Sequence, residues 1–306
     1  MSPSRDPFSR QPNRPFPTPV KHLRYHGGFT GRRMTVCIAA ICHNGGYPKI
    51  VICADTRFAS AFVGSTDSAF KIKPLPYGWL LLLATDDWNS ALTLYSHLSK
   101  IWGTLKDSSP AVICDKLEKQ FSRHQFCSKA TDALICGFTK GHDPVVLYLG
   151  VSPEESPAIV LSAVPEFETI GCGSVIARVF LMQRDCGAIK SLDYILYSVY
   201  EAKKASEKEG NVGPKTHLAI IGPPSPKSPH SCSLIPIRED GIKLLERWRR
   251  KKWLRSVSDV LPDVSTYIDK SEADVTREFQ LGFLSSTDDL STLQPLQEPP
   301  GESDES

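Results

Sequence analysis

Three residues near the start of the chain have the types that nucleophilic catalysis by a threonine requires. They are Thr35, Asp55 and Lys71, and Lys71 lies 16 residues beyond Asp55. A threonine hydroxyl is a weak nucleophile and needs a neighbouring base. The α-amine of an N-terminal threonine, with an ordinary pKa of about 7.7–8.0, is such a base. A lysine beside it favours the neutral amine, and an aspartate neutralises and holds the lysine. The three types indicate hydrolysis by an N-terminal threonine, on condition that Thr35 becomes the first residue.

The same residues also have a purely structural explanation. Asp55 and Lys71 are able to form an ion pair within a folded core, and Thr35 is able to serve as an ordinary strand residue. Residue types alone favour this second explanation, because charged pairs and strand threonines are common in proteins without activity. The elements that position the three residues must therefore be considered.

Two short apolar runs are predicted to bring Thr35 and Asp55 together. Residues 35–41 and 49–54 are rich in small and β-branched side chains, which is typical of strands covered on both faces. Between them, residues 43–48 (His-Asn-Gly-Gly-Tyr-Pro) are expected to form the hairpin loop, since Asn-Gly and Gly-Gly supply the positive φ that such a loop requires. An antiparallel hairpin returns Asp55, at the end of the second strand, to Thr35, at the start of the first.

The sequence of this stretch resembles the opening of proteasome β-type subunits and their relatives in the N-terminal-nucleophile (Ntn) hydrolase superfamily. The resemblance rests on residues 34–37 (Met-Thr-Val-Cys), residues 55–57 (Asp-Thr-Arg) and Lys71, and is closest to ancestral-type bacterial β subunits. It implies that Thr35 is the nucleophile, that Lys71 tunes it and that Asp55 orients Lys71. It also implies a peptidase or amidohydrolase without a cofactor, a peptide or amide substrate, and assembly into a homo-oligomeric ring.

The start of the chain departs from the family pattern in two ways. Thr35 and Asp55 are four residues further apart than in the family, which the hairpin loop is expected to absorb. In addition, 33 residues precede Met34, and Thr35 cannot act while its nitrogen is in a peptide bond. Self-cleavage after Met34, where the family usually has glycine, would free the nitrogen. Translation from Met34 followed by removal of that methionine would do the same. If neither happens, the protein is a catalytically inactive structural or assembly subunit of the same fold.

Three further segments correspond to parts of the chain that support the active site in the family. The resemblance implies an oxyanion hole that includes the backbone N–H of Thr85, where the family commonly has glycine. Cys172, within residues 170–174 (Ile-Gly-Cys-Gly-Ser), replaces the first serine of a Gly-Ser-Gly-Ser turn, and its thiol is only a weak donor. Glu209 and Val212 replace the acid and the serine of Asp-x-x-Ser-Gly-Gly, so the acid is kept and the serine is absent.

The rest of the chain alternates between patterns of strands and patterns of helices. Helices are predicted through residues 91–102, after a cap signal at residues 85–87, and at about 109–127, 174–186 and 190–206. Strands are predicted at residues 78–84, 132–138, 145–151, 158–162, 167–171 and 216–221. With the resemblance, this order predicts an α+β fold over residues 34–222, a four-layer αββα sandwich in which two antiparallel sheets lie between layers of helices.

Both ends of the chain are predicted to lie outside this domain. Residues 1–33 are basic and rich in proline and are expected to be a disordered leader, either a propeptide or a misplaced start. Residues 223–306 are expected to form an extension with a basic helix, ending at residues 247–255, and an acidic disordered tail. Such a basic run is able to bind nucleic acid or an acidic membrane face. It is more often a solvated helix face, and neither partner is predicted.

The composition is that of an ordinary globular protein, with 41% hydrophobic and 23% charged residues. No apolar run reaches the length of a membrane span, and a net charge of +2 is too small to imply nucleic acid. The nine cysteines include no Cys-x-x-Cys, so a zinc site is not predicted. An odd number of cysteines without a secretory signal favours a reducing compartment, and the cytoplasm is the predicted location.

Overall fold

The structure is a computed structural model, and it describes residues 35–250 apart from 45–46, 61–63, 67–69, 86, 106, 122–130, 153–157 and 226–230. The predictions for the leader at residues 1–33, for Met34 and for the tail beyond residue 250 lie outside the described residues. So do residues 122–127, the end of the second predicted helix.

The first sheet contains the hairpin that the sequence predicts. Its strand order is β10-β1-β2-β11-β12, and every neighbouring pair is antiparallel. The strands are β1 (Cys37–Asn44), β2 (Tyr47–Asp55), β10 (Phe167–Ile170), β11 (Thr216–Gly222) and β12 (Ser233–Pro236). The predicted strand at residues 216–221 therefore lies next to the hairpin and pairs with β2.

The second sheet is also antiparallel and has the order β5-β6-β7-β8-β9. Its strands are β5 (Ile72–Pro74), β6 (Leu80–Thr85), β7 (Thr131–Phe138), β8 (Pro144–Ser152) and β9 (Ala158–Val164). A short 3-10 turn, η1 (Pro76–Gly78), connects β5 to β6. Between the two sheets in sequence, β3 (Phe58–Ser60) and β4 (Gly64–Thr66) pair with each other in a separate two-stranded sheet.

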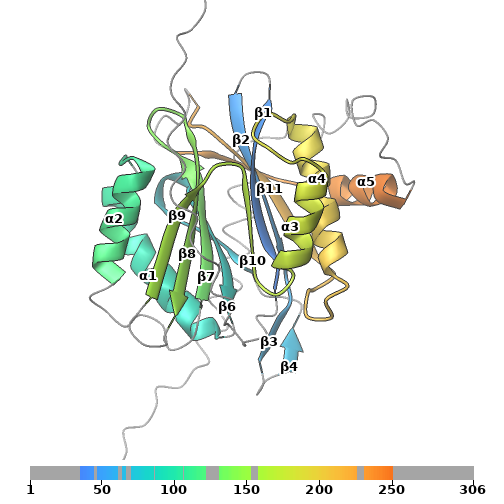
Figure 1. Ribbon diagram of the computed structural model, residues 1–306, viewed down its shortest axis with the longest axis horizontal. Coiled ribbons are helices and arrows are strands. Elements are labelled where there is room, and N and C mark those ends of the chain that lie inside the picture. Colours follow the sequence, from blue (N-terminus) through green and yellow to red (C-terminus); the bar gives the residue numbers. More distant parts are fainter. Residues whose placement is uncertain are drawn as a thin grey trace, which may run out of the picture. The chain divides into compact units, whose positions relative to one another are not determined.

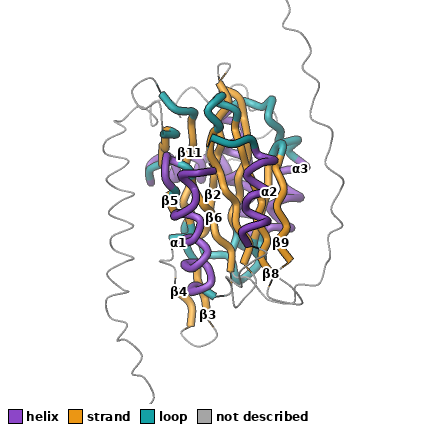
Figure 2. The backbone as a smooth tube through the Cα atoms, turned by 90° about the vertical axis from the view of Figure 1, so that its left-hand side faces the viewer, coloured by secondary structure: helices purple, strands orange, loops and turns teal. Residues whose placement is uncertain are grey.

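Helices cover the two sheets on opposite sides of the strand layers (Figure 1). α1 (Trp88–Leu105) contacts β6 and α2 (Pro110–Phe121) contacts β9, whereas α3 (Ser174–Gln183) and α4 (Leu192–Ser206) contact β1. Figure 2 shows α1 and α2 lying over the strands. The predicted α+β class is confirmed, because the described residues form two antiparallel five-stranded sheets and five α-helices, the fifth being α5 (Glu239–Arg250).

The apolar runs of the hairpin are buried on both faces, as predicted. On β1, Cys37, Ala39 and Ile41 pack into the core that is shared with the second sheet. The alternate residues Ile38 and Ala40 pack into a separate core that includes residues of α3 and α4. Because successive strand side chains point to opposite faces, a strand with two apolar neighbours needs apolar residues at every position.

Two helices, α1 and α4, begin next to a side chain that caps their first turn. Asp87 caps α1, since its Oδ2 accepts hydrogen bonds from the N–H of Ser90 at 3.0 Å and from the Ser90 hydroxyl at 2.6 Å. Ser191 caps α4 by accepting from the N–H of Tyr194. Both caps satisfy N–H groups that have no partner within the helix, and the Asp87 cap lies within the signal that the sequence predicts.

Two elements differ in extent from the sequence expectations. The hairpin ladder continues to the pair Asn44–Tyr47, so most of the residues expected to form its loop belong to the strands. β12 and α5 come from the predicted C-terminal extension, but β12 pairs with β11 at the edge of the first sheet. α5 packs on α4, where the hydroxyl of Tyr200 donates to Glu246 at 2.9 Å.

Candidate active site

Thr35, Asp55 and Lys71 form one connected, buried cluster. Their exposed fractions are 1%, 0% and 3%. The hydroxyl of Thr35 donates to Asp55 Oδ1 at 2.6 Å, and Lys71 Nζ donates to the same oxygen at 2.7 Å. Lys71 Nζ also donates to Thr35 Oγ1. Each of the three residues that the sequence singles out thus contacts the other two.

The hairpin and the second sheet together position this cluster. Antiparallel pairing of Cys37 with Ala54 places Asp55 beside the start of β1, where the N–H of Val36 donates to Asp55 Oδ1 at 2.9 Å. Lys71 precedes β5 in the other sheet, and its carbonyl accepts from the N–H of Leu83 on β6 at 3.1 Å. The cluster therefore lies where the two sheets meet, with the hydroxyl and the carboxylate from one and the ammonium from the other.

The second oxygen of Asp55 is held by backbone groups. Oδ2 accepts from the N–H of Arg57 at 3.1 Å and from the N–H of Gly213 at 2.8 Å. These donors compensate for the loss of water around a carboxylate that is fully buried. They also fix its orientation, so that Oδ1 is directed toward Lys71 and Thr35.

The turn between β10 and α3 encloses the backbone of Thr35. The N–H of Thr35 donates to Cys172 Sγ at 3.3 Å, and the Thr35 carbonyl accepts from the N–H of Gly173 at 3.1 Å. Burial raises the pKa of the Cys172 thiol, which therefore keeps its proton near neutral pH and donates to the Thr35 carbonyl at 3.4 Å. Cys172 is thus in direct contact with the candidate nucleophile.

Gly171 in this turn is required by its conformation and by its closeness to Thr35. Its φ is +92°, and a Cβ at this position would lie 2.3 Å from the Thr35 carbonyl oxygen. Gly171→Ala is therefore expected to destabilise the protein by at least about 2 kcal/mol, since a left-handed alanine is strained and Thr35 must move. Denaturant unfolding of the variant measures this loss.

Gly210→Ala is the matched control for Gly171→Ala. Gly210 is exposed, and a Cβ there meets nothing within 4 Å. Its effect on the free energy of unfolding is expected to stay within about 0.5 kcal/mol. Equal effects of the two substitutions would contradict the tight enclosure of Thr35 by the turn.

Thr85 ends β6 at the corner that leads into α1. Its hydroxyl forms hydrogen bonds with the backbone of Asp87, at 3.0 Å, and with the hydroxyl of Thr131, at 3.1 Å. The N–H of Leu83 points to Lys71, and N–H groups two residues apart on a strand point to the same neighbour. The N–H of Thr85 therefore points to the same side of β6 as the N–H of Leu83, which is the side on which Lys71 lies.

Glu209 differs from the other predicted site residues because it is exposed. Its carbonyl accepts from the N–H of Val212 at 2.8 Å, which closes a turn after α4. Val212 is buried in the apolar core with α3 and α4. This turn reaches the cluster through the N–H of Gly213 rather than through the carboxylate of Glu209.

Sequence reasoning missed two groups around Asp55, the N–H of Gly213 and the side chain of Lys203. Lys203 is 0% exposed and donates to the carbonyl of Gly213 at 2.9 Å. A backbone donor has no signature in residue type. The available signal for Lys203 was its position on the apolar stripe of a predicted helix, between Val199 and Ser206, where a charged residue is unusual.

His217 is a further titratable side chain close to the cluster. It lies on β11 opposite Ala54, and its ring packs against that of Phe70 with centroids 4.9 Å apart. Burial lowers the pKa of His217, and the charges of Lys203, Lys215 and Lys71 act in the same direction, while Asp55 opposes them. The folded protein therefore keeps this imidazole neutral at pH values where the unfolded chain protonates it.

This lowered pKa predicts a pH dependence of stability. As pH falls below about 6.5, the ordinary histidine value, the unfolded state binds the extra proton, so the free energy of unfolding is expected to decrease. Denaturant unfolding between pH 5 and 8 checks this, and His217→Phe should show a smaller decrease. His142→Asn, at an exposed histidine with positive φ, should behave as the unchanged protein. A His217→Phe profile that matches the original would contradict the prediction.

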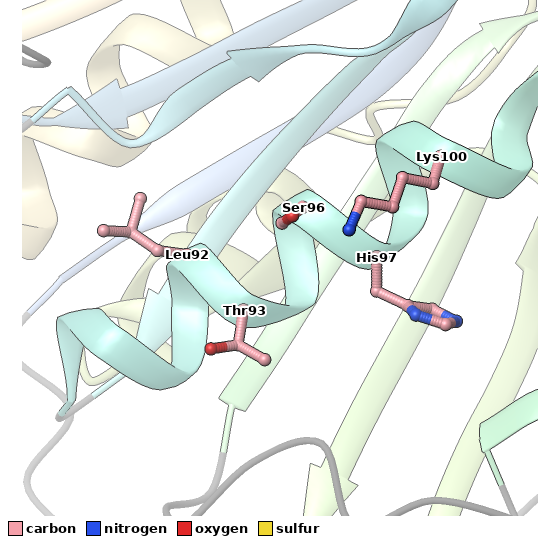
Figure 3. A pocket seen from close by; sticks show the side chains of 5 residues that line it. All are labelled: Leu92, Thr93, Ser96, His97 and Lys100. Atoms are coloured by element: carbon pink, nitrogen blue, oxygen red, sulfur yellow. The ribbon is translucent and has the colours of Figure 1, made fainter.

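A pocket with a volume of about 370 Å³ lies away from this cluster, on α1. The described side chains that line it all come from that helix (Figure 3): Leu92, Thr93, Ser96, His97 and Lys100. None of them is a predicted site residue. Among the described residues no group of His, Cys, Asp and Glu side chains is arranged to hold a metal ion, and no described helix is long and apolar enough to cross a membrane.

Comparison with known proteins leaves the site to be interpreted from its own geometry. No family model matches the chain, and no curated protein matches it significantly. The contacts of Thr35, Asp55 and Lys71 and the motif that carries the resemblance therefore point to the function.

Proposed function

We propose that this protein is a threonine-type peptidase or amidohydrolase of the proteasome β-like class, with Thr35 as its N-terminal nucleophile after removal of residues 1–34. The observation that carries the proposal is the mutual contact of the Thr35 hydroxyl, Lys71 Nζ and Asp55 Oδ1 in a buried site. A merely structural ion pair does not need a threonine hydroxyl that contacts both of its charges, two residues before the start of β1.

The arrangement of sheets and helices supports the same class. We propose that the fold is the four-layer αββα sandwich of the Ntn hydrolases. The two antiparallel sheets pack on each other through β1 and β8, with α1 and α2 against one sheet and α3 and α4 against the other. In such a fold the nucleophile lies at the start of a strand between the two sheets, and the position of Thr35, two residues before β1, supports the proposal.

The proposed reaction starts with attack of Thr35 Oγ1 on the carbonyl carbon of a peptide or amide. The hydroxyl proton passes to the free α-amine of Thr35, and Lys71 Nζ stabilises negative charge on the attacking oxygen. Asp55 holds Lys71 in place. When the carbon–nitrogen bond breaks, the leaving amine takes the proton from the α-ammonium, and an ester remains on Thr35. Water then attacks this ester with the α-amine as base. The bond between the acyl carbon and Thr35 Oγ1 breaks, Oγ1 takes the proton from the α-ammonium, and the acid is released.

The oxyanion that forms in both steps needs donors near Thr35. The N–H of Thr85 is proposed as one of them, because it points to the side of β6 on which Lys71 lies. Thr85 stands where the family commonly has glycine, but this donor is kept, since the N–H belongs to the backbone. Cys172 supports the site by donating to the Thr35 carbonyl and by contacting the Thr35 nitrogen.

The rival proposal is a catalytically inactive structural or assembly subunit of the same fold. Val212 favours it, because a buried apolar side chain stands where the family has a serine. The exposure of Glu209 favours it as well. Assembly into a ring and a cytoplasmic location remain predictions for either proposal.

The N-terminus decides between the two proposals. The mass and N-terminal sequence of the protein purified from its own cells are expected to place the first residue at Thr35. Protein that starts at Thr35 should then gain the mass of one peptide epoxyketone, a reagent that bonds to both the hydroxyl and the amine of an N-terminal threonine. A chain that retains Met34 in its own cells would support the inactive subunit.

A further inference from the structure

A buried cation lies behind Asp55, on the side away from Thr35. Lys203 on α4 is 0% exposed, and its Nζ donates to Glu207 Oε1 at 2.5 Å, to the carbonyl of Gly213 at 2.9 Å and to the carbonyl of Pro214 at 3.1 Å. Burial lowers the pKa of Lys203, while Glu207 opposes this effect. Two of its three acceptors belong to the loop between α4 and β11, so the side chain fixes that loop.

The loop that Lys203 fixes is the one that contacts the site carboxylate. Gly213 accepts from Lys203 with its carbonyl and donates to Asp55 Oδ2 with its N–H at 2.8 Å. One residue therefore connects Nζ of Lys203 to the carboxylate, and this carboxylate connects in turn to Lys71 and Thr35. The connection uses only backbone groups of Gly213.

The loop backbone lies directly against the Asp-Thr-Arg turn. A Cβ on Gly213 would lie 2.6 Å from Arg57 Cβ and 2.8 Å from the Arg57 nitrogen. Arg57 Nη1 donates to the carbonyl of Gly210 at 2.9 Å at the other end of the loop. Val212 cannot provide a hydrogen bond through its side chain. The hydrogen bond that holds Gly213 from the side of α4 is donated by Lys203.

We propose that Lys203 is a positioning residue, which holds the N–H of Gly213 against Asp55 and thereby sets the carboxylate that orients Lys71 at Thr35. The effect on catalysis rests on the proposed function, whereas the effect on the Gly213–Asp55 hydrogen bond does not. The two are therefore tested separately.

The first test follows the Gly213 amide by nuclear magnetic resonance in glycine-labelled protein. An N–H that donates to a buried carboxylate is deshielded, and Asp55→Asn provides the reference for a weakened bond. Lys203→Met keeps a stem of similar size but removes the charge and the donors. Its Gly213 resonance is expected to move toward that of Asp55→Asn, with about tenfold less protection from hydrogen exchange.

Lys204→Met is the matched control. The neighbouring Lys204 binds the same Glu207 carboxylate, at 2.7 and 2.8 Å, but it donates to neither carbonyl of the loop within the described part of the chain. Its Gly213 resonance and exchange are expected to stay unchanged. Lys203→Arg, which keeps the charge and the donors, should retain most of the original shift.

The second test measures acylation of Thr35 by the epoxyketone in protein that starts at Thr35. Lys203→Met is expected to lower the acylation rate constant by about tenfold with little change in reagent affinity, and Lys203→Arg should recover part of it. If the unchanged protein is not acylated, the proposed function fails, and the Gly213 measurement still decides the inference.

An unchanged Gly213 resonance and exchange rate in Lys203→Met would overturn the inference. If that variant does not fold, Lys203→Gln takes its place, since it retains one donor without the buried charge, and a smaller shift in the same direction is expected. Failure of both variants to fold would assign Lys203 a purely structural role and would equally overturn the inference.

Discussion

Thr35→Ala is expected to abolish the reaction of the protein with a peptide epoxyketone, with a loss of at least about 10³-fold in the rate of acylation. The substitution removes the hydroxyl that contacts Asp55 Oδ1 and Lys71 Nζ and leaves no other hydroxyl in that position. The measurement is the intact mass over time in protein that starts at residue 35. Peptide mapping of the unchanged protein should place the label on Thr35.

Two further variants define what this loss means. Thr35→Ser keeps the hydroxyl and the amine and should retain measurable acylation. Thr104→Ala removes an exposed threonine of α1, whose hydroxyl donates to the carbonyl of Ile101 in the same helix, and should react as the unchanged protein does. Equal labelling of Thr35→Ala and the unchanged protein would reject Thr35 as nucleophile and favour the inactive subunit.

Lys71→Met is expected to have the largest effect on stability, a loss of about 3–5 kcal/mol in the free energy of unfolding. Asp55 is 0% exposed, so removal of Lys71 leaves a buried carboxylate without the ammonium that it contacts. The backbone donors Val36, Arg57 and Gly213 still contact it, but they carry only partial charges. Denaturant unfolding at pH 7 measures the loss, and acylation of Thr35 should disappear with it.

The control for this prediction is an ion pair on the surface. Lys119 and Asp115 on α2 are 68% and 58% exposed, and Lys119→Met is expected to change the free energy of unfolding by less than about 0.5 kcal/mol. The double variant Lys71→Met/Asp55→Asn should be more stable than Lys71→Met alone, since it removes the unpaired charge, and should stay unreactive. A loss below about 1 kcal/mol for Lys71→Met would show that the pair is not isolated from water.

The sequence alone determined the local part of the site. Continuous apolar runs with a glycine-containing connection predict an antiparallel hairpin, and the pairing of that hairpin brings Asp55 beside Thr35. This inference succeeded because strand period, turn residues and register are local properties of the chain. The same properties predicted β6 to β11 and α1 to α4 to within a few residues, but they did not predict the short strands β3, β4 and β5 or the end of the hairpin ladder.

The tertiary structure decided which distant groups complete the site. Lys71 reaches Thr35 only because the edge of the second sheet packs beside the first, and its spacing from Asp55 suggested this through a resemblance rather than through geometry. Cys172 and Gly213 act on Thr35 and Asp55 across more than one hundred residues of chain, 137 and 158 respectively. Glu209 points to solvent although its position matches an acid of the family.

The physical reason for this division is the range of the interactions. Burial and strand pairing leave a periodic pattern of side-chain types that is visible in the sequence. A backbone N–H such as that of Gly213, or a close approach such as that of Gly171 to Thr35, depends on loop conformation, for which residue type gives little information. Lys203 is an example of both kinds of information. Its position on an apolar stripe is visible in the sequence. The carbonyl groups that accept from its buried Nζ belong to a loop that only the folded chain places there.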